Sequence, residues 1–300
     1  MSYNLITILG PTAAGKTKLA AKLAKEFDGE IISADSRQVY RHMNIGTGKD
    51  LDDYSVKGRI IRYHLIDVIE PTEEFSLYKF NQLFYQSFNE INRRNKIPFL
   101  VGGTGLYISS ILKGYLLSKA NLSKKNLELF DRYSTEELKN ILLETSSQLH
   151  NTTDLLDKER IIKAIIVASA SAGSSPERNS ISSLVMGIKL PRIEIKKRIT
   201  ERLKFRLDNG MLTEVENLLK NGISHNKLIF FGLEYKFIDL YLRKELTYND
   251  MFQKLNSAIH NFAKKQMTWF RKMEKEGIRI NWIEGPDFEQ AKKIIVENYL

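Results

Sequence analysis

The chain has 300 residues, 42% of them hydrophobic and none of them cysteine, so it is long enough for one large or two modest domains and excludes disulfides, thiolate nucleophiles and cysteine-ligated zinc. Because no apolar run is long enough to span a bilayer and a strand is predicted almost directly after Met1, we expect a cytoplasmic protein without a signal peptide or a membrane partner. The net charge of +10 favours polyanionic partners, although a solvated basic surface explains it equally well.

Predicted strands and helices alternate in the first third of the chain. Short apolar runs predict the strands, and apolar residues at helical spacing predict the helices. In chain order the elements are Asn4–Leu9 (strand), Lys16–Phe27 (helix), Glu30–Ala34 (strand), Arg62–Val68 (strand), Leu77–Arg93 (helix) and Ile97–Val101 (strand). This alternation predicts an α/β fold with a parallel sheet, in which ligands bind beyond the carboxyl ends of the strands.

The pattern changes after Gly114. It is helical from about Leu117 to Ala172, ends in a run of small and polar residues, and gives way to one more predicted strand over Leu184–Leu190. From Pro191 the pattern is helical almost to the end. A sheet that resumes after a helical stretch indicates an inserted helical subdomain over residues 117–182, with the core formed by 1–116 and 183–300 and a mainly helical C-terminal half.

The stretch GPTAAGKT, residues 10–17, has the phosphate-loop (P-loop) form G-x-x-x-x-G-K-[ST]. Its glycines permit a backbone path that points N–H groups at an anion, Lys16 adds a mobile charge, and the Thr17 hydroxyl is suited to ligate Mg²⁺. A strand before it and a helix after it favour phosphate binding over a chance match, and nucleotide chemistry is the default function. The predicted diphosphate-binding residues are Gly10, Pro11, Thr12, Ala13, Ala14, Gly15, Lys16 and Thr17.

Two further strand exits carry candidate residues. Asp35 follows the second strand, where it suits a metal ligand, a helix N-cap or a general base, and position alone does not choose among the three. The GGTG stretch, Gly102–Gly105, offers a second concave turn. There the Thr104 hydroxyl is placed to meet a substrate oxygen, although a simple strand-to-helix turn explains the stretch equally well.

Two basic clusters occur in the C-terminal half. Arg198, Arg202 and Arg206 follow one another at helical i, i+4 spacing and so share one face. The second cluster lies in a helix that also contains Trp269 and Phe270, so bases have rings to stack on beside phosphate contacts; its members are Lys264, Lys265, Arg271 and Lys272. A single charged stripe is usually a solvated face, but two clusters beside a phosphate loop favour RNA as the partner.

These residues resemble the tRNA dimethylallyltransferases of the bacterial type, also called tRNA isopentenyltransferases, over nearly the whole chain. The second motif discriminates best, because D-S-x-Q-x-Y…I-G-T-x-K is not a general feature of phosphate-loop proteins. The motifs are GPTAAGKT at 10–17, ISADSRQVYRHMNIGTGK at 32–49, VGGTGLYI at 101–108, the segment from KRITERL to GMLTEV at 197–215, and AKKQMTWFR at 263–271.

The resemblance implies a substrate and a reaction. The donor is dimethylallyl diphosphate, and the acceptor is the exocyclic amine of the adenosine directly 3′ to the anticodon, flipped out of its stack. Asp35 is then the general base for that amine. The departing diphosphate is stabilised by Lys16, by Mg²⁺ bound to Thr17, by the N–H groups of the loop, and by an arginine for which Arg202 matches best.

The resemblance also implies a set of tRNA contacts, with a monomer as the default expectation. Besides Asp35 and Thr104, these contacts are Ser36, Arg37, Gln38, Glu159, Arg160, Ile161, Ile162 and Lys163. The chain departs from the family at Ile259, His260 and Lys265 in one helix, and at Glu234 where G-Y-[RK] is usual. Because these are RNA-facing or structural positions in the family, the departures concern tRNA contacts and substrate range rather than transfer chemistry.

Three alternative functions fit the same loop. A kinase that uses ATP needs an acidic Mg²⁺ ligand after a distal strand, for which Asp67 is the candidate, but a kinase gives no reason for the IGTGK stretch at 45–49. A prenyltransferase that acts on free adenine nucleotides leaves the long basic C-terminal half unexplained. A noncatalytic RNA-binding protein is disfavoured because Asp35 and Lys16 are both present.

Overall fold

The computed structural model describes residues 3–115, 117, 124–130, 132–145, 158–170 and 180–299. The chain divides into two compact units, the first formed by Met1–Gly114 with Ser180–Leu300 and the second by Tyr115–Asn179. None of the described helices is both long enough and apolar enough to cross a membrane. The first unit contains the sheet and the phosphate loop.

The first unit is built on a six-stranded parallel sheet with the order β5-β2-β6-β1-β7-β8. β1 lies in the middle of the sheet, with Ile8 opposite Val101 on one side and Met186 on the other. The predicted parallel sheet is therefore confirmed. The strands are β1 (Leu5–Leu9), β2 (Gly29–Ala34), β5 (Tyr63–His64), β6 (Ile97–Gly102), β7 (Ser183–Lys189) and β8 (Asn281–Glu284).

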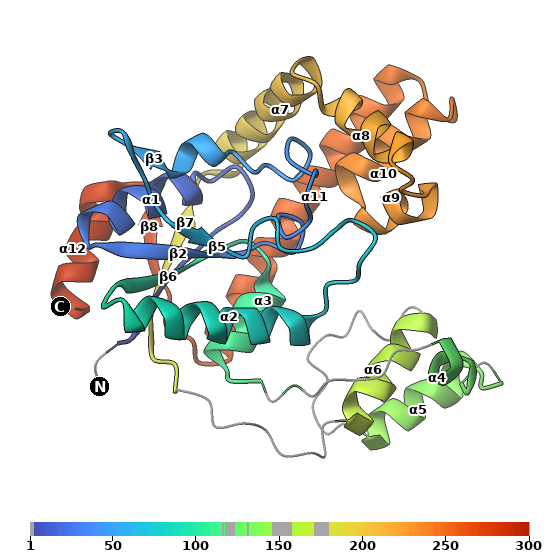
Figure 1. Ribbon diagram of the computed structural model, residues 1–300, viewed down its shortest axis with the longest axis horizontal. Coiled ribbons are helices and arrows are strands. Elements are labelled where there is room, and N and C mark those ends of the chain that lie inside the picture. Colours follow the sequence, from blue (N-terminus) through green and yellow to red (C-terminus); the bar gives the residue numbers. More distant parts are fainter. Residues whose placement is uncertain are drawn as a thin grey trace. The chain divides into compact units, whose positions relative to one another are not determined.

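Helices cover both faces of this sheet (Figure 1). Successive side chains of a strand point to opposite faces, so Ile6 and Ile8 pack with α1 (Lys16–Glu26) and α12 (Phe288–Asn298). On the other face Leu5 and Leu9 pack with α2 (Leu77–Arg93), α3 (Gly105–Leu112) and the C-terminal part of α11 (Tyr248–Lys275). Burial on both faces explains why β1 and β6 are almost continuously apolar.

The C-terminal half adds a cluster of helices that ends in one long helix. α11 buries one side chain every three or four residues, which gives it a continuous apolar stripe against the rest of the unit; the buried residues are Met251, Leu255, Ile259, Ala263, Gln266, Phe270 and Met273. The preceding helices are α7 (Arg192–Asp208), α8 (Met211–Lys220), α9 (His225–Phe231) and α10 (Leu233–Leu242).

One sequence prediction of secondary structure was wrong in its extent, and one strand was not predicted. The strand expected over Arg62–Val68 contains only Tyr63–His64, because Leu65 and Asp67 adopt positive φ angles of 64° and 54°, which end an extended strand. The C-terminal half is mainly helical, as expected, and also contains β8 at the edge of the sheet, which was not predicted. The structure also has a short hairpin and 3-10 turn between β2 and β5, formed by Leu51–Tyr54, Ser55–Val56 and Arg59–Ile60.

The second unit is helical in its described residues. α4 (Lys124–Glu128), α5 (Thr135–Thr145) and α6 (Lys158–Ala170) are its elements. A small apolar core joins α5 to α6 through Leu138, Leu142, Ile161, Ile162 and Ile165. The run of small and polar residues at 169–183 lies mostly outside the described residues.

Candidate functional site

The phosphate loop runs from the end of β1 to the start of α1 in a path that requires small residues. Ala13 and Gly15 adopt left-handed conformations, with φ angles of 64° and 84°. A Cβ atom at Gly10 would lie 3.0 Å from the Ile188 carbonyl oxygen of the neighbouring strand, so a side chain there would require that strand to shift. The Lys16 ammonium donates to the carbonyl oxygen of Pro11 over 2.8 Å, so this cation folds back over the loop.

The amide of Gln266, on α11, joins the phosphate loop to the exit of β6. Its Oε1 accepts a hydrogen bond from the Thr12 backbone N–H at 2.8 Å, and its Nε2 donates to the Gly103 carbonyl at 2.9 Å. A Cβ atom at Gly103 would collide with Gln266, and one at Gly105 would collide with Trp269 of the same helix. Gly103 and Gly105 therefore have no room for a side chain because α11 packs directly on them, whereas Gly102 is closed off by Ala34 of β2. Sequence reasoning quoted Gln266 within a motif but gave it no role.

The exits of β2 and β6 meet at Asp35 and Thr104. The Thr104 hydroxyl accepts a hydrogen bond from the Ser36 N–H at 3.2 Å. Asp35 Oδ1 accepts from the Arg37 N–H at 2.8 Å and from the Gln38 N–H at 3.3 Å. Of the three roles considered for Asp35, this oxygen performs that of a cap, but over a turn and not at a helix end. The role of general base stays a prediction.

Two cations lie close together at the phosphate loop. The Arg202 guanidinium donates to the Thr12 hydroxyl. Its burial and the charge of nearby Arg206 lower the pKa of Arg202 to about 10. Burial, and then the charge of Arg202, lower the pKa of Lys16 to about 8, with Asp35 opposing the shift. Arg206 forms an ion pair with Asp50 at 3.2 Å, whereas Arg202 and Lys16 have no carboxylate within ion-pair distance among the described residues. These two lowered pKa values indicate a site that an anion would stabilise.

A single carboxylate from α8 holds the loop that follows Arg37. Glu214 accepts hydrogen bonds from the backbone N–H groups of Asn44, Ile45 and Gly46, at 2.7, 2.6 and 3.0 Å. The Tyr235 hydroxyl donates to the same carboxylate at 2.8 Å. Sequence reasoning missed the role of Glu214, although the residue lies within the GMLTEV motif, which was itself recognised.

Side-chain contacts inside the same loop explain several of its polar residues. The Gln38 amide donates to the Gly48 carbonyl at 3.0 Å. The Lys49 ammonium is buried and contacts both the Tyr40 carbonyl and the Asp67 carboxylate. Asp67, the candidate Mg²⁺ ligand of the kinase alternative, is therefore engaged in an ion pair that holds the loop.

Glu234, one of the departures from the family pattern, lies among the charges of the site. It is in the first turn of α10, next to Tyr235. Burial raises the pKa of Glu234, while the nearby charges of Arg206 and Arg202 oppose that shift and Asp35 adds to it. The position where the family has a glycine thus places a carboxyl group close to both arginines.

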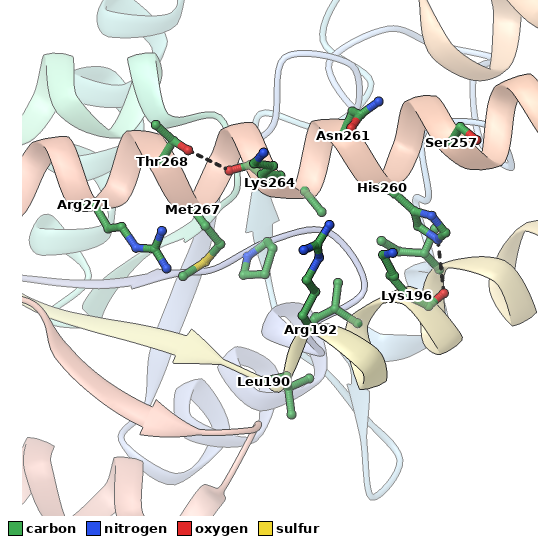
Figure 2. Close-up of a pocket in the computed structure, with 14 residues that line it drawn as sticks. Leu190, Arg192, Lys196, Ser257, His260, Asn261, Lys264, Met267, Thr268 and Arg271 are labelled. Atoms are coloured by element: carbon green, nitrogen blue, oxygen red, sulfur yellow. Dashed lines mark hydrogen bonds between the residues drawn. The ribbon is translucent and has the colours of Figure 1, made fainter.

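A basic groove of about 660 Å³ lies between α7 and α11 beside the phosphate loop (Figure 2). Arg192 of α7 and Arg271 of α11 extend into the space between the two helices. The His260 Nε2 atom donates to the Lys196 carbonyl at 3.3 Å and so joins the helices. The remaining lining is partly apolar; the groove residues are Pro11, Leu190, Arg192, Ile195, Lys196, Ile199, Ser257, His260, Asn261, Ala263, Lys264, Met267, Thr268 and Arg271. Arg198 is not among them and pairs with Glu194 at 2.5 Å.

The run Glu159–Lys163 belongs to α6 of the second unit. Ile161 and Ile162 are buried in its small core, whereas Glu159 and Arg160 are exposed. Lys163 forms an ion pair with Glu159 at 2.7 Å. Glu159 and Arg160 thus face outward, and Lys163 does so in part. The contact of this run with tRNA stays a prediction.

Among the described residues, few side chains at the phosphate loop are suited to ligate a metal ion. Thr17 lies in the first turn of α1, directly after Lys16. In the part of the chain that the structure describes, no three His, Cys, Asp or Glu side chains are grouped so that they could hold a metal ion. A single hydroxyl fits Mg²⁺ that is held chiefly by substrate phosphates and water, which is the usual arrangement at phosphate-binding sites.

The chain matches two known protein families. Residues 38–273 match the family described as IPP transferase, and residues 3–67 match the family described as isopentenyl transferase. Among curated relatives, tRNA dimethylallyltransferase 2 of Pelobacter propionicus is 46% identical over 99% of this chain and 95% of its own length. tRNA dimethylallyltransferase 1 of Syntrophus aciditrophicus is 47% identical over 99% of both chains.

Solved structures show the same fold. The tRNA isopentenylpyrophosphate transferase of Bacillus halodurans aligns with a TM-score of 0.68 at 30% identity, covering 98% of this chain and 94% of that one. A eukaryotic dimethylallyltransferase acting on tRNA aligns with a TM-score of 0.72 at 22% identity, covering 98% of this chain and 78% of the other.

Proposed function

Because the chain belongs to the IPP transferase family, we propose that it is a tRNA dimethylallyltransferase. It transfers the dimethylallyl group of dimethylallyl diphosphate to the exocyclic amine of the adenosine directly 3′ to the anticodon, and it releases diphosphate. The observation that carries this proposal is the juxtaposition of a cationic phosphate loop with Asp35 and Thr104 at adjacent strand exits. One part of the site suits a leaving diphosphate, and the other suits a nucleophile that must lose a proton.

The donor half of the reaction breaks the allylic carbon–oxygen bond and leaves its electron pair on the diphosphate. Lys16 and Arg202, together with the N–H groups of the loop, stabilise the negative charge that develops there. Both cations have lowered pKa values in the free site. An anion that restores them to their ordinary values therefore binds with a favourable electrostatic free energy.

The acceptor half forms a bond between the adenosine amine nitrogen and the allylic carbon. Asp35 accepts the proton that the amine loses, so the carboxylate ends the step neutral. Its Oδ1 is held by the Arg37 and Gln38 N–H groups, which fixes the orientation of the carboxylate. The Thr104 hydroxyl, which already accepts from the Ser36 N–H, has its own proton to donate to the substrate.

Mg²⁺ is the proposed cofactor. Thr17 is the side chain that would hold it, and the ion would neutralise part of the diphosphate charge.

The tRNA is proposed to bind along the basic groove between α7 and α11. Lys264 and Arg271 line this groove and supply phosphate contacts, with Arg192 and Lys196 on the opposite helix. The outward-facing residues of α6 are a second proposed contact. We further propose that the protein acts as a monomer in the cytoplasm, where tRNA is available to it.

The proposed reaction is tested by supplying the purified protein with a total tRNA pool, Mg²⁺, and either labelled dimethylallyl diphosphate or labelled ATP. Mass spectrometry of the digested tRNA then identifies any changed nucleoside. A prenylated adenosine that appears only with dimethylallyl diphosphate supports the proposal. Consumption of ATP without a modified nucleoside supports the kinase alternative, and prenylation of free adenine nucleotides in preference to tRNA supports the adenine-nucleotide prenyltransferase.

A further inference from the structure

An exposed aromatic ring stands beside the loop that contains Asp35. Phe230, in the last turn of α9, is 54% exposed, and its neighbour Ile229 is 40% exposed. Phe231 is buried and makes edge contacts with Tyr40 at 4.9 Å and with Tyr235 at 5.8 Å between ring centres. The buried ring anchors the end of α9, so the exposed ring of Phe230 is held on a fixed support.

Two cations lie over this ring, which nevertheless remains 54% exposed. The Arg37 guanidinium carbon lies 5.4 Å from the centre of the Phe230 ring, and the Lys227 ammonium lies 5.2 Å from it. Arg37 donates to the Phe230 carbonyl at 3.1 Å, and Lys227 donates to the Glu73 carbonyl at 2.8 Å. Backbone carbonyls thus position both cations, and neither one pairs with a carboxylate among the described residues. Burial lowers the pKa of both Arg37 and Lys227.

The combination of an exposed ring with two fixed cations suits single-stranded nucleic acid. A nucleobase stacks on the ring, and the phosphates on either side of the base meet the cations. A purely apolar protein partner would use the ring but would leave the positive charges without a role. The ring and its cations also lie close to the proposed chemistry. Arg37 donates its backbone N–H to Asp35, the proposed base for the target adenosine.

We infer that Phe230 is a stacking platform for an unpaired base of the tRNA anticodon loop next to the adenosine that is modified, with Arg37 and Lys227 contacting the adjoining phosphates. This inference rests on the proposed function, because it takes tRNA as the substrate. It goes beyond that function by assigning a position-selecting role to a residue outside the phosphate loop and outside the strand exits. The platform holds the loop open at the base next to the target and so presents the adenosine to Asp35.

The test uses an anticodon stem–loop RNA that has 2-aminopurine beside the target adenosine, so that stacking on a protein ring changes its fluorescence. Phe230→Leu removes the ring and keeps an apolar side chain, and Phe230→Tyr keeps the ring. Ile229→Ala is the matched control, since it removes an exposed apolar side chain one residue away. We expect Phe230→Leu to weaken RNA binding by about tenfold or more and to abolish the fluorescence change, with an unaltered salt slope. Phe230→Tyr and Ile229→Ala should behave like the wild type.

Steady-state measurement of transfer separates this inference from the proposed function. Phe230→Leu should raise the KM for tRNA and leave the KM for dimethylallyl diphosphate unchanged. If the wild type transfers the prenyl group and Phe230→Leu matches it in affinity and fluorescence, the platform is refuted and the proposed function stands. If the wild type binds the RNA with a stacking signal but transfers nothing, the platform stands and the proposed function fails. A wild type that does not bind the RNA refutes both.

Discussion

Gln266 donates from its side-chain amide to the carbonyl oxygen of Gly103 over 2.9 Å, although 163 residues separate the two in the chain. The other end of the same amide accepts from the phosphate loop at Thr12. One buried side chain on α11 thus fixes the distance between the place where the diphosphate is proposed to bind and the strand exit that carries Thr104.

Replacement of Gln266 by alanine should loosen this connection. Gln266→Ala leaves the Thr12 N–H and the Gly103 carbonyl without their partner, so we expect a loss of about 1 to 3 kcal/mol in the free energy of unfolding. The KM for dimethylallyl diphosphate should rise, because the loop that binds it is less well ordered. Chemical denaturation and steady-state kinetics measure the two effects. Gln253→Ala, an exposed change on the same helix outside the groove, is the control, and equal behaviour of the two variants would contradict the prediction.

The lowered pKa of Lys16 predicts a pH dependence of diphosphate binding. In the free protein this pKa is about 8, and a bound anion raises it. Below about pH 8 the ammonium is already protonated, so affinity should be insensitive to this group. Above about pH 8 binding must take up a proton, and affinity should fall by up to tenfold per pH unit until the pKa of the complex is reached.

Isothermal titration of an unreactive dimethylallyl diphosphate analogue in buffers of different ionisation enthalpy measures this proton uptake directly. At pH 9 we expect binding to take up nearly one proton. At pH 7 we expect Lys16 to contribute little proton uptake. Lys16→Arg keeps the positive charge at both pH values and should abolish the uptake between them. Proton uptake at pH 9 that is the same in Lys16→Arg and in the wild type would exclude Lys16 as the titrating group.

Two replacements of Asp35 separate its contact with the turn from its proposed chemistry. Asp35→Asn keeps an oxygen that can accept from the Arg37 and Gln38 N–H groups but cannot take a proton from the adenosine amine. It should lower turnover by about a hundredfold or more while tRNA binding and thermal stability stay nearly intact. Asp35→Ala should add a loss of about 1 kcal/mol of stability, since the cap is removed as well. Comparable turnover in Asp35→Asn and the wild type would remove Asp35 from the base role.

The basic groove predicts a difference between cations that line it and cations that do not. Lys264→Ala or Arg271→Ala should each reduce the slope of log affinity against log salt concentration for tRNA by about one. Arg198→Ala should change it less, because Arg198 already pairs with Glu194 and lies outside the groove. Filter binding or fluorescence anisotropy over a salt series gives the slopes. Three equal slopes would show that the groove has no special role.

The sequence predicted those parts of the fold that depend on local pattern. Continuous apolar runs predicted β1, β2, β6 and β7. The P-loop motif predicted a helix that begins at its lysine, which is where α1 begins. β8 was missed because a four-residue edge strand has too short a pattern to stand out from the surrounding helices. The strand around Tyr63 was overextended because positive φ angles at Leu65 and Asp67 are not visible in an apolar run.

In the candidate site, too, only the features that depend on local sequence could be predicted. Glycines and Lys16 reveal a phosphate loop because few residue types permit that backbone path. The contacts of Gln266 and Glu214 with the loops could not be predicted, since each joins segments more than 160 residues apart and only the folded chain brings them together. The placement of Glu234 near Arg202 and Arg206 likewise depends on how α10 packs against α9 and α11, not on local sequence.

The most direct test of the central claim uses two anticodon stem–loop RNAs that differ only at the nucleotide 3′ to the anticodon, one with adenosine and the other with guanosine. Each is incubated with the protein, Mg²⁺ and dimethylallyl diphosphate, and fragmentation mass spectrometry locates any added group. We predict one dimethylallyl group on the adenosine at that position, none on the guanosine RNA, and a strongly reduced rate with Asp35→Asn. An unmodified adenosine RNA, or a group added elsewhere in both RNAs, would contradict the proposed reaction.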